Sequence, residues 1–203
     1  MKRFLTLLML VSALGARSQT SGYQVGDKAA DFRLKNVDNK MVSLKDFPDA
    51  KGFIVAFTCN TCPVSQAYEE RIKALHRDYA PKGYPVIAIN PNDPEAQPGD
   101  SFEKMQARAK DKGYKFPYLM DPGHTVARQF GATRTPHVFI VQKTSGGPVV
   151  RYIGAVDDDT EDSSPDKQKF VENALKALLS GRDPEPSFTK AVGCSIKWKK
   201  EKV

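Results

Sequence analysis

The chain has 203 residues, a length that suits one domain rather than several. Hydrophobic residues make up 40% and charged residues 27%, which is the composition of a folded protein and excludes a chain that is disordered throughout. The formal net charge is +7, but three of the basic residues lie within the first 17 positions and most of the others are scattered. We therefore expect no nucleic-acid partner.

The first residues have the pattern of an export signal. Lys2 and Arg3 precede an apolar run over residues 4–14, and the small residues Ala16 and Ser18 stand where a signal peptidase cleaves. This run is shorter than the ~20 apolar residues of a membrane-spanning helix. We therefore predict a signal peptide over residues 1–18. The mature protein is expected in a periplasm or outside the cell, without stable membrane insertion, where disulfides can form.

The rest of the chain alternates between strand and helix patterns. Two short stretches around Asp38-Asn39 predict a hairpin over residues 31–44 at the edge of a sheet. The unbroken apolar run 53–58 predicts a central strand, and apolar residues at three- and four-residue steps predict a helix from Cys62 to about residue 81. The further expected elements are a strand over 85–90, a helix from Asp100 to about 112 with Asp100 and Glu103 as a capping box, an extended piece over 116–120, a short helix over 124–130, strands over 138–142 and 149–156 that pair as a hairpin, and an amphipathic helix over 169–179. This order indicates an α/β domain with a mixed sheet.

Cys59 and Cys62 form a C-x-x-C motif between a predicted buried strand and the start of a predicted helix. A thiolate attacks disulfides, and the free amides at a helix N-terminus favour negative charge. We expect Cys59 to be the more exposed and more acidic thiol, and Cys62 to reach back and form a reversible disulfide with it, which releases a substrate held as a mixed disulfide. A structural disulfide and half of a zinc site are the other interpretations, but no second C-x-x-C or H-x3-H supplies further zinc ligands.

At these residues the chain resembles a known fold. Strand 53–58, the motif followed by Pro63, a long helix and Thr135-Pro136 before strand 138–142 resemble the thioredoxin-like fold, over roughly residues 25–179. Within that fold, the stretches 88–102, 131–140 and 193–199 are similar to the exported redoxins of the alkyl hydroperoxide reductase/thiol-specific antioxidant (AhpC/TSA) group, which includes TlpA-like thiol reductases. The resemblance implies a three-layer sandwich with a mixed central sheet and the hairpin as an N-terminal extension. We expect the domain over residues 25–182 and a C-terminal tail over 183–203.

The resemblance also implies roles for individual residues. Cys59 would be the nucleophile, Cys62 the resolving cysteine, Pro136 a cis-proline beside their disulfide and Thr135 a substrate-binding residue. It implies a thiol-disulfide oxidoreductase without a cofactor, whose partners are a protein disulfide substrate and a thiol that donates electrons.

Two alternative functions remain open. If Cys62-Pro63 is aligned with the peroxide-attacking cysteine of peroxiredoxins, Cys59 stands where those proteins have Thr or Ser, so a thiol peroxidase is less favoured than a disulfide reductase. Cys59, Cys62 and His137 together would make a soft three-ligand site for Cu(I), similar to that of Sco copper-delivery proteins, although Sco-like motifs have three residues between the cysteines. A histidine at the start of a buried strand is more typically a packed, hydrogen-bonded residue.

Two features lie outside these motifs. Cys194 stands alone in a basic tail, where Ile196 and Trp198 alternate like a short edge strand. We predict a docked structural tail, with a second resolving thiol as the alternative. The acidic residues of segment 157–162 are interpreted as a solvated loop rather than a cation site.

Overall fold

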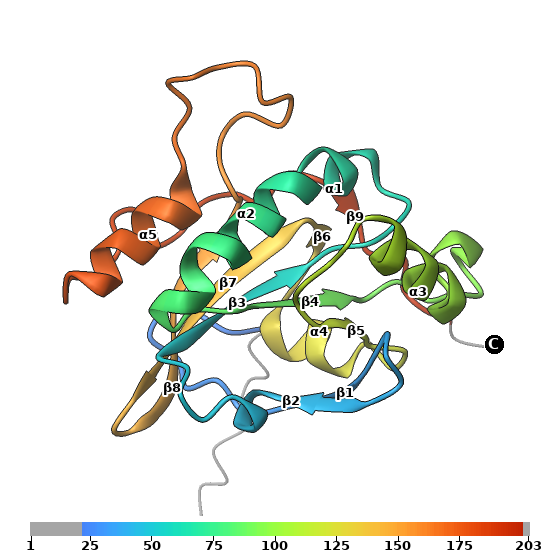
Figure 1. The fold of residues 1–203 in the computed structure, drawn as a ribbon, viewed down its shortest axis with the longest axis horizontal. Coiled ribbons are helices and arrows are strands. Elements are labelled where there is room, and N and C mark those ends of the chain that lie inside the picture. The colour runs from blue at the N-terminus through green and yellow to red at the C-terminus, as the bar shows by residue number, and fades with distance from the viewer. Residues whose placement is uncertain (1–21, 201–203) are drawn as a thin grey trace, which may run out of the picture.

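The structure is a computed structural model that describes residues 22–200, so the predicted signal peptide lies outside the described residues. A seven-stranded mixed sheet in the order β2-β1-β5-β4-β3-β7-β8 forms its centre (Figure 1). Its strands are β1 (Arg33–Asn36), β2 (Met41–Ser43), β3 (Gly52–Phe57), β4 (Val86–Asn90), β5 (Tyr118–Met120), β7 (His137–Thr144) and β8 (Gly147–Gly154). A second small sheet pairs β6 (Arg134–Thr135) with β9 (Cys194–Ser195).

The central strands are the apolar runs of the sequence. All residues of β3 and β4 are buried, because helices cover both faces of the sheet at this position. β3 pairs in parallel with β4 and antiparallel with β7, which confirms the mixed sheet. The hairpin β1–β2 lies at one edge, as predicted. The predicted pairing of β7 with β8 is also present, and this hairpin forms the other edge.

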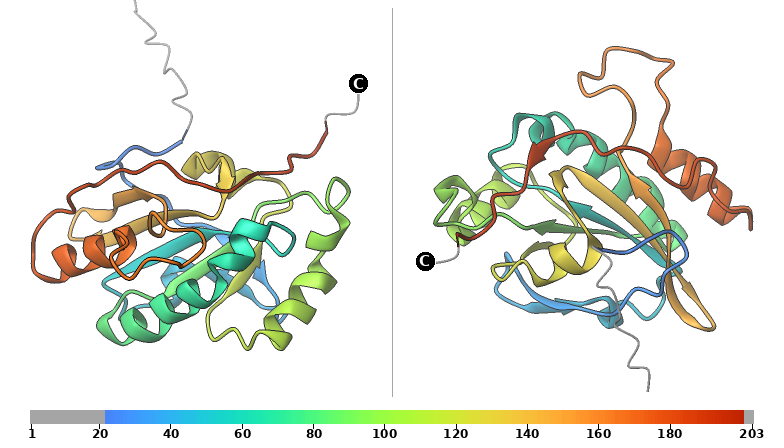
Figure 2. Two further views of the ribbon diagram at one scale, coloured as in Figure 1. Left: turned by 90° about the horizontal axis from the view of Figure 1, so that it is seen from above. Right: turned by 180° about the vertical axis from the view of Figure 1, so that it is seen from behind.

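Helices and the C-terminal tail form the outer two layers (Figure 2). The helices α2 (Glu69–Tyr79), α3 (Phe102–Asp111) and α5 (Phe170–Leu179) pack their apolar residues on one face of the sheet. α4 (Thr125–Phe130) packs on the opposite face, together with Ile196 of the tail. The expected three-layer sandwich is therefore present. Across residues 22–200, no helix is long and apolar enough to cross a membrane.

Two details differ from the sequence predictions. The helix predicted from Cys62 is divided at Tyr68 into α1 (Pro63–Ala67) and α2. The predicted capping box at Asp100 is wrong: Ser101 is the N-cap of α3, and its hydroxyl accepts a hydrogen bond from the Lys104 amide at 3.4 Å. Asp100 lies in a preceding 3-10 turn over Pro98–Asp100 and is fully buried, because its side chain points to the C-x-x-C segment.

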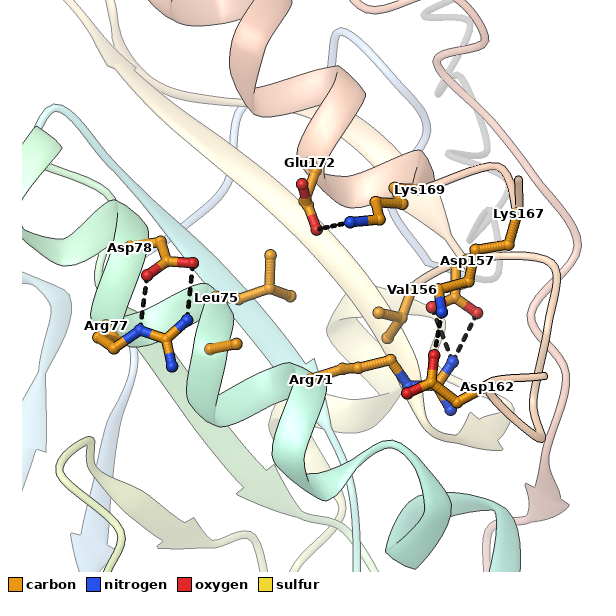
Figure 3. Close-up of a pocket in the computed structure, with 11 residues that line it drawn as sticks. Arg71, Leu75, Arg77, Asp78, Val156, Asp157, Asp162, Lys167, Lys169 and Glu172 are labelled. Carbon is orange, nitrogen blue, oxygen red and sulfur yellow. Dashed lines mark hydrogen bonds and ion pairs between the residues drawn. The ribbon is translucent and has the colours of Figure 1, made fainter. Parts of the chain in front are cut away.

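The acidic segment 157–162 lies beside α2, and its first residue is buried (Figure 3). The Arg71 guanidinium donates hydrogen bonds to Asp157 Oδ2 at 2.8 Å and to the Thr160 carbonyl at 2.7 Å. Asp162 is exposed and pairs with Lys167. The expected solvated loop is thus confirmed for the exposed acidic residues, while Asp157 fixes the start of the loop to α2.

Candidate active site

The C-x-x-C motif occupies the turn between β3 and α1, as the sequence predicts. Cys62 is the N-cap of α1: its backbone is extended, and its sulfur accepts a hydrogen bond from the Ser65 amide at 3.5 Å. Pro63 follows as the first helical residue, a position where the missing amide proton costs no hydrogen bond. The sulfur that lies at the free amides of this helix is therefore that of Cys62.

The disulfide of the structure joins Cys62 to Cys194, with the two Cα atoms 6.0 Å apart, and Cys59 is a free thiol. The expected Cys59–Cys62 pairing is thus not the one observed. The reason lies in the tail, since β9 runs antiparallel to β6 and places Cys194 opposite Thr135. The Thr135 carbonyl oxygen lies only 3.2 Å from Cys62 Sγ, so this pairing brings Cys194 to Cys62.

Cys59 is the more exposed of the two motif cysteines, as predicted, but the difference is small and both are buried. It is 5% exposed, against 3% for Cys62, and its sulfur lies 3.2 Å from the Thr135 hydroxyl. Burial raises the pKa of the Cys59 thiol, the negative charge of Asp100 raises it further, and hydrogen bonds from the Thr135 hydroxyl and the backbone oppose this shift. The expectation of a lowered pKa is therefore wrong for this state, because the helix begins after Cys62 and Cys59 lies outside it.

Thr135, which precedes Pro136, contacts both cysteines of the motif. The Thr135–Pro136 peptide bond has the cis form that the resemblance implied. Thr135 is fully buried, its hydroxyl contacts Cys59 and its backbone pairs with Cys194. The residue predicted to bind substrate is therefore covered by the tail in this state.

His137 does not join the cysteines. Its Nδ1 accepts a hydrogen bond from the Thr133 amide at 3.4 Å, and its ring centre lies 4.6 Å from that of Phe139. Burial lowers the pKa of His137 to about 4. In the part of the chain that the structure describes, no group of three His, Cys, Asp or Glu side chains is placed to hold a metal ion. The set Cys59, Cys62 and His137 is therefore not assembled here, and His137 is a packed residue of the core.

A buried carboxylate, which the sequence analysis missed, holds the two residues between the cysteines. Asp100 Oδ1 accepts hydrogen bonds from the Asn60 amide at 2.6 Å and from Asn90 Nδ2 at 3.3 Å. Its Oδ2 accepts from the Thr61 hydroxyl and from Asn92 Nδ2, both at 2.8 Å. None of the ion pairs found among residues 22–200 includes Asp100. The buried carboxylate is therefore stabilised by these four hydrogen bonds and not by a cationic side chain.

The docked tail that we predicted is present. Ile196 is 3% exposed and packs in the core beneath α4. The Lys197 amide donates a hydrogen bond to Asn92 Oδ1 at 2.9 Å, and the Lys199 amide donates one to His124 Nε2 at 2.8 Å. The Trp198 ring lies 5.1 Å from the His124 ring. These contacts hold the tail to the fold on the C-terminal side of Cys194.

The chain is similar to known proteins over most of its length. A model of the AhpC/TSA family matches residues 25–152. A thiol-disulfide oxidoreductase ResA from Bacillus cereus (strain ATCC 10987 / NRS 248) is 24% identical over 157 residues, which cover 74% of this chain and 85% of that protein.

Two solved structures have the same architecture. An uncharacterized conserved protein from Geobacillus kaustophilus is 36% identical, with a TM-score of 0.81 over 88% of this chain and 94% of that one. Peroxidoxin BcpB from Mycobacterium tuberculosis has a TM-score of 0.54 at 19% identity, over 68% of this chain and 88% of that one. The fold is therefore thioredoxin-like. Because the family model spans more than half of the sequence, the chain belongs to the AhpC/TSA family.

Proposed function

We propose that this protein is an exported thiol-disulfide oxidoreductase that acts on protein disulfides through Cys59 and Cys62. The observation that carries the proposal is the convergence of both cysteine sulfurs on Thr135: each lies 3.2 Å from an oxygen atom of that residue, next to cis-Pro136. The ResA relative is named as an enzyme of this class. The sequence pattern of residues 1–18 supports export.

In the proposed reaction the Cys59 thiolate attacks a substrate disulfide. One substrate sulfur leaves as a thiolate, and the other stays bonded to Cys59 as a mixed disulfide. The Cys62 thiolate then attacks Cys59 Sγ, forms the Cys59–Cys62 disulfide and releases the second substrate thiol. The Ser65 amide at the start of α1 stabilises the Cys62 thiolate for this step. A thiol donor returns the pair to the reduced state, and no cofactor takes part.

Access to Cys59 requires a movement of the tail. Cys59 and Thr135 are both buried, and Cys194 is bonded to Cys62 and paired with Thr135. A substrate therefore reaches Cys59 and Thr135 only after the Cys62–Cys194 bond is reduced and the segment around Cys194 moves away.

Insulin reduction tests the proposal. The reduced full-length mature chain is assayed with dithiothreitol as the donor, beside Cys59→Ser and Cys62→Ser, with Ser195→Ala as the matched control because Ser195 is exposed and lies next to Cys194. We expect both cysteine variants to lose activity by about a hundredfold or more and the control to retain it. Full activity in Cys59→Ser, or no activity in the wild type, would contradict the proposal.

A thiol peroxidase is the second candidate, and the N-cap position of Cys62 favours it. In that reaction the Cys62 thiolate attacks a peroxide oxygen, becomes a sulfenic acid and releases the other oxygen as water or an alcohol. A sulfenic-acid probe distinguishes the two candidates: rapid, peroxide-dependent labelling of Cys62 in Cys59→Ser supports the peroxidase, and its absence supports the oxidoreductase.

A further inference from the structure

We infer that Cys194 is a third redox-active cysteine, whose thiolate attacks Cys62 Sγ of the Cys59–Cys62 disulfide and displaces Cys59. The inference rests on the proposed function, because the Cys59–Cys62 disulfide is the product of substrate reduction. It extends that function, because the oxidised site then passes its disulfide to the tail and leaves Cys59 as a thiol. The structure, with Cys62–Cys194 bonded and Cys59 free, is the state after this exchange.

The three cysteines of the chain meet around one residue. Cys59 Sγ contacts the Thr135 hydroxyl, Cys62 Sγ lies against the Thr135 carbonyl, and Cys194 is the β-sheet partner of Thr135. Cys62 is the central member, since it is bonded to Cys194 and separated from Cys59 by the two-residue spacing that permits a C-x-x-C disulfide. The two alternative disulfides thus share Cys62 and differ only in its partner.

Contacts other than the disulfide place Cys194 for the attack. Arg134 Nη1 donates a hydrogen bond to the Gly193 carbonyl at 3.1 Å, and the Asp93 amide donates one to the Lys197 carbonyl at 2.8 Å. Ile196 is buried in the core between these two points. Contacts other than the disulfide therefore hold the tail on both sides of Cys194. The Cys194 thiol thus attacks Cys62 as an intramolecular group at high effective concentration.

The exchange is balanced in atoms and electrons. The Cys194 Sγ–Cys62 Sγ bond forms as the Cys59 Sγ–Cys62 Sγ bond breaks, and no oxidant or reductant is consumed. The proton that Cys194 gives to solvent is matched by the one that Cys59 takes up. Burial and the Asp100 charge raise the pKa of the Cys59 thiol, so the displaced Cys59 sulfur takes up a proton and is held as a thiol. Cys194 is also the least buried of the three cysteines, which makes its sulfur the accessible one for an external thiol donor.

Time-resolved disulfide mapping tests the inference. The reduced full-length mature chain is mixed with glutathione disulfide, quenched with acid at intervals, alkylated in denaturant and digested, and the cysteine pairs are measured by mass spectrometry. We expect Cys59–Cys62 to form first and then to give way to Cys62–Cys194, with about a tenfold excess of the second pair at the end, which corresponds to ~1.4 kcal/mol. Cys194→Ser should stop at Cys59–Cys62. Cys59→Ser should form Cys62–Cys194 about tenfold more slowly, because the first pair is missing. Ser195→Ala should follow the wild type.

Two results would overturn the inference. One is a wild-type chain that ends as Cys59–Cys62 with Cys194 alkylated. The other is a Cys62–Cys194 pair that forms as rapidly in Cys59→Ser as in the wild type, since the disulfide then arises without the C-x-x-C pair. Insulin reduction by the wild type distinguishes the two proposals. If the protein reduces insulin but gives one of these two results, the role of Cys194 is refuted and the proposed function stands. If it does not reduce insulin but forms the disulfides in the expected order, the proposed function is refuted and the exchange stands.

Discussion

Replacing Asp100 by Asn tests how the buried carboxylate controls the C-x-x-C segment. Asp100 is fully buried and accepts four hydrogen bonds, two at each oxygen. An asparagine side chain keeps one acceptor oxygen and replaces the other by an NH2 group. If its oxygen stays at the Asn60 amide, the new NH2 group faces the Thr61 hydroxyl and Asn92 Nδ2. The hydroxyl can turn and accept, but the Asn92 amide cannot turn, because its oxygen already accepts from Lys197.

The magnitude follows from these contacts. One hydrogen bond to a charged group is lost, which is worth about 1.5–3 kcal/mol, and a buried donor is left without a partner at a cost of about 1–3 kcal/mol. Burying a neutral amide in place of a carboxylate offsets part of this loss. We expect Asp100→Asn to lower the free energy of unfolding by about 3 kcal/mol, which is about 10 °C in melting temperature for a domain of this size. We also expect the pKa of the Cys59 thiol to fall, since the Asp100 charge is one of the causes that raise it.

Two measurements check this prediction. Urea unfolding of the oxidised protein gives the stability, and the pH dependence of Cys59 alkylation gives the thiol pKa, because a change in access alone alters the rate at every pH without moving the midpoint. Asp49→Asn removes a charge from an exposed position and serves as the control. The role assigned to Asp100 would be refuted if the pH midpoint of Cys59 alkylation in Asp100→Asn stayed in place or rose. It would also be refuted if the free energy of unfolding of this variant equalled that of the control.

Three further predictions concern single side chains. His137→Asn should make stability less dependent on pH on the acid side. The imidazole has its ordinary pKa of 6.5 in the unfolded chain and a pKa of about 4 when buried, so the free energy of unfolding of the wild type should fall by about 2 kcal/mol from about pH 7.5 to about pH 5. Urea unfolding at these pH values checks this, and an equal fall in the variant would contradict it. Ser65→Ala should leave the urea midpoint unchanged or raise stability by up to about 1 kcal/mol, because the buried Ser65 hydroxyl has no hydrogen-bond partner among the described residues; a loss above about 2 kcal/mol would show a missing partner. Gly193→Ala should undock the tail, because an added Cβ would overlap the Thr135 carbonyl; we expect limited proteolysis within the tail to accelerate about tenfold or more, and wild-type resistance would refute the close contact.

Local patterns were sufficient to predict most of the fold. The apolar runs that became β3 and β4 and the helical spacing that became α2 depend on burial on one or both faces, a property that each segment carries in its own sequence. The division of the first helix at Tyr68 was not predictable in the same way. Apolar spacing continues through this residue, and no residue type near it marks a break. The Tyr68 hydroxyl donates a hydrogen bond to distant Asp157 at 2.9 Å, a contact that local spacing does not indicate.

At the site, too, local sequence patterns did not predict contacts between residues far apart in the sequence. The C-x-x-C motif was found because its residue types and spacing are informative by themselves, whereas Thr135 and Pro136 were expected at the site from the resemblance to the thioredoxin-like fold. Asp100 was misread as a helix cap, because Asp followed by Glu103 three residues later fits that pattern, while its true partners, Asn60 and Thr61, lie about 40 positions away in sequence. The Cys62–Cys194 pair, 132 residues apart, depends on where the tail docks, and no local pattern encodes that.

The proposed chemistry is tested most directly by trapping the mixed disulfide. Cys62→Ser removes the resolving thiol, and Cys59→Ser removes the proposed nucleophile. Each full-length reduced variant is incubated with a disulfide-bonded protein substrate, quenched with acid and mapped by mass spectrometry. We predict that Cys62→Ser accumulates the substrate bonded to Cys59 and that Cys59→Ser traps nothing. Substrate bonded to Cys62 in Cys59→Ser, with none at Cys59 in the other variant, would contradict the assignment of Cys59 as the attacking thiol.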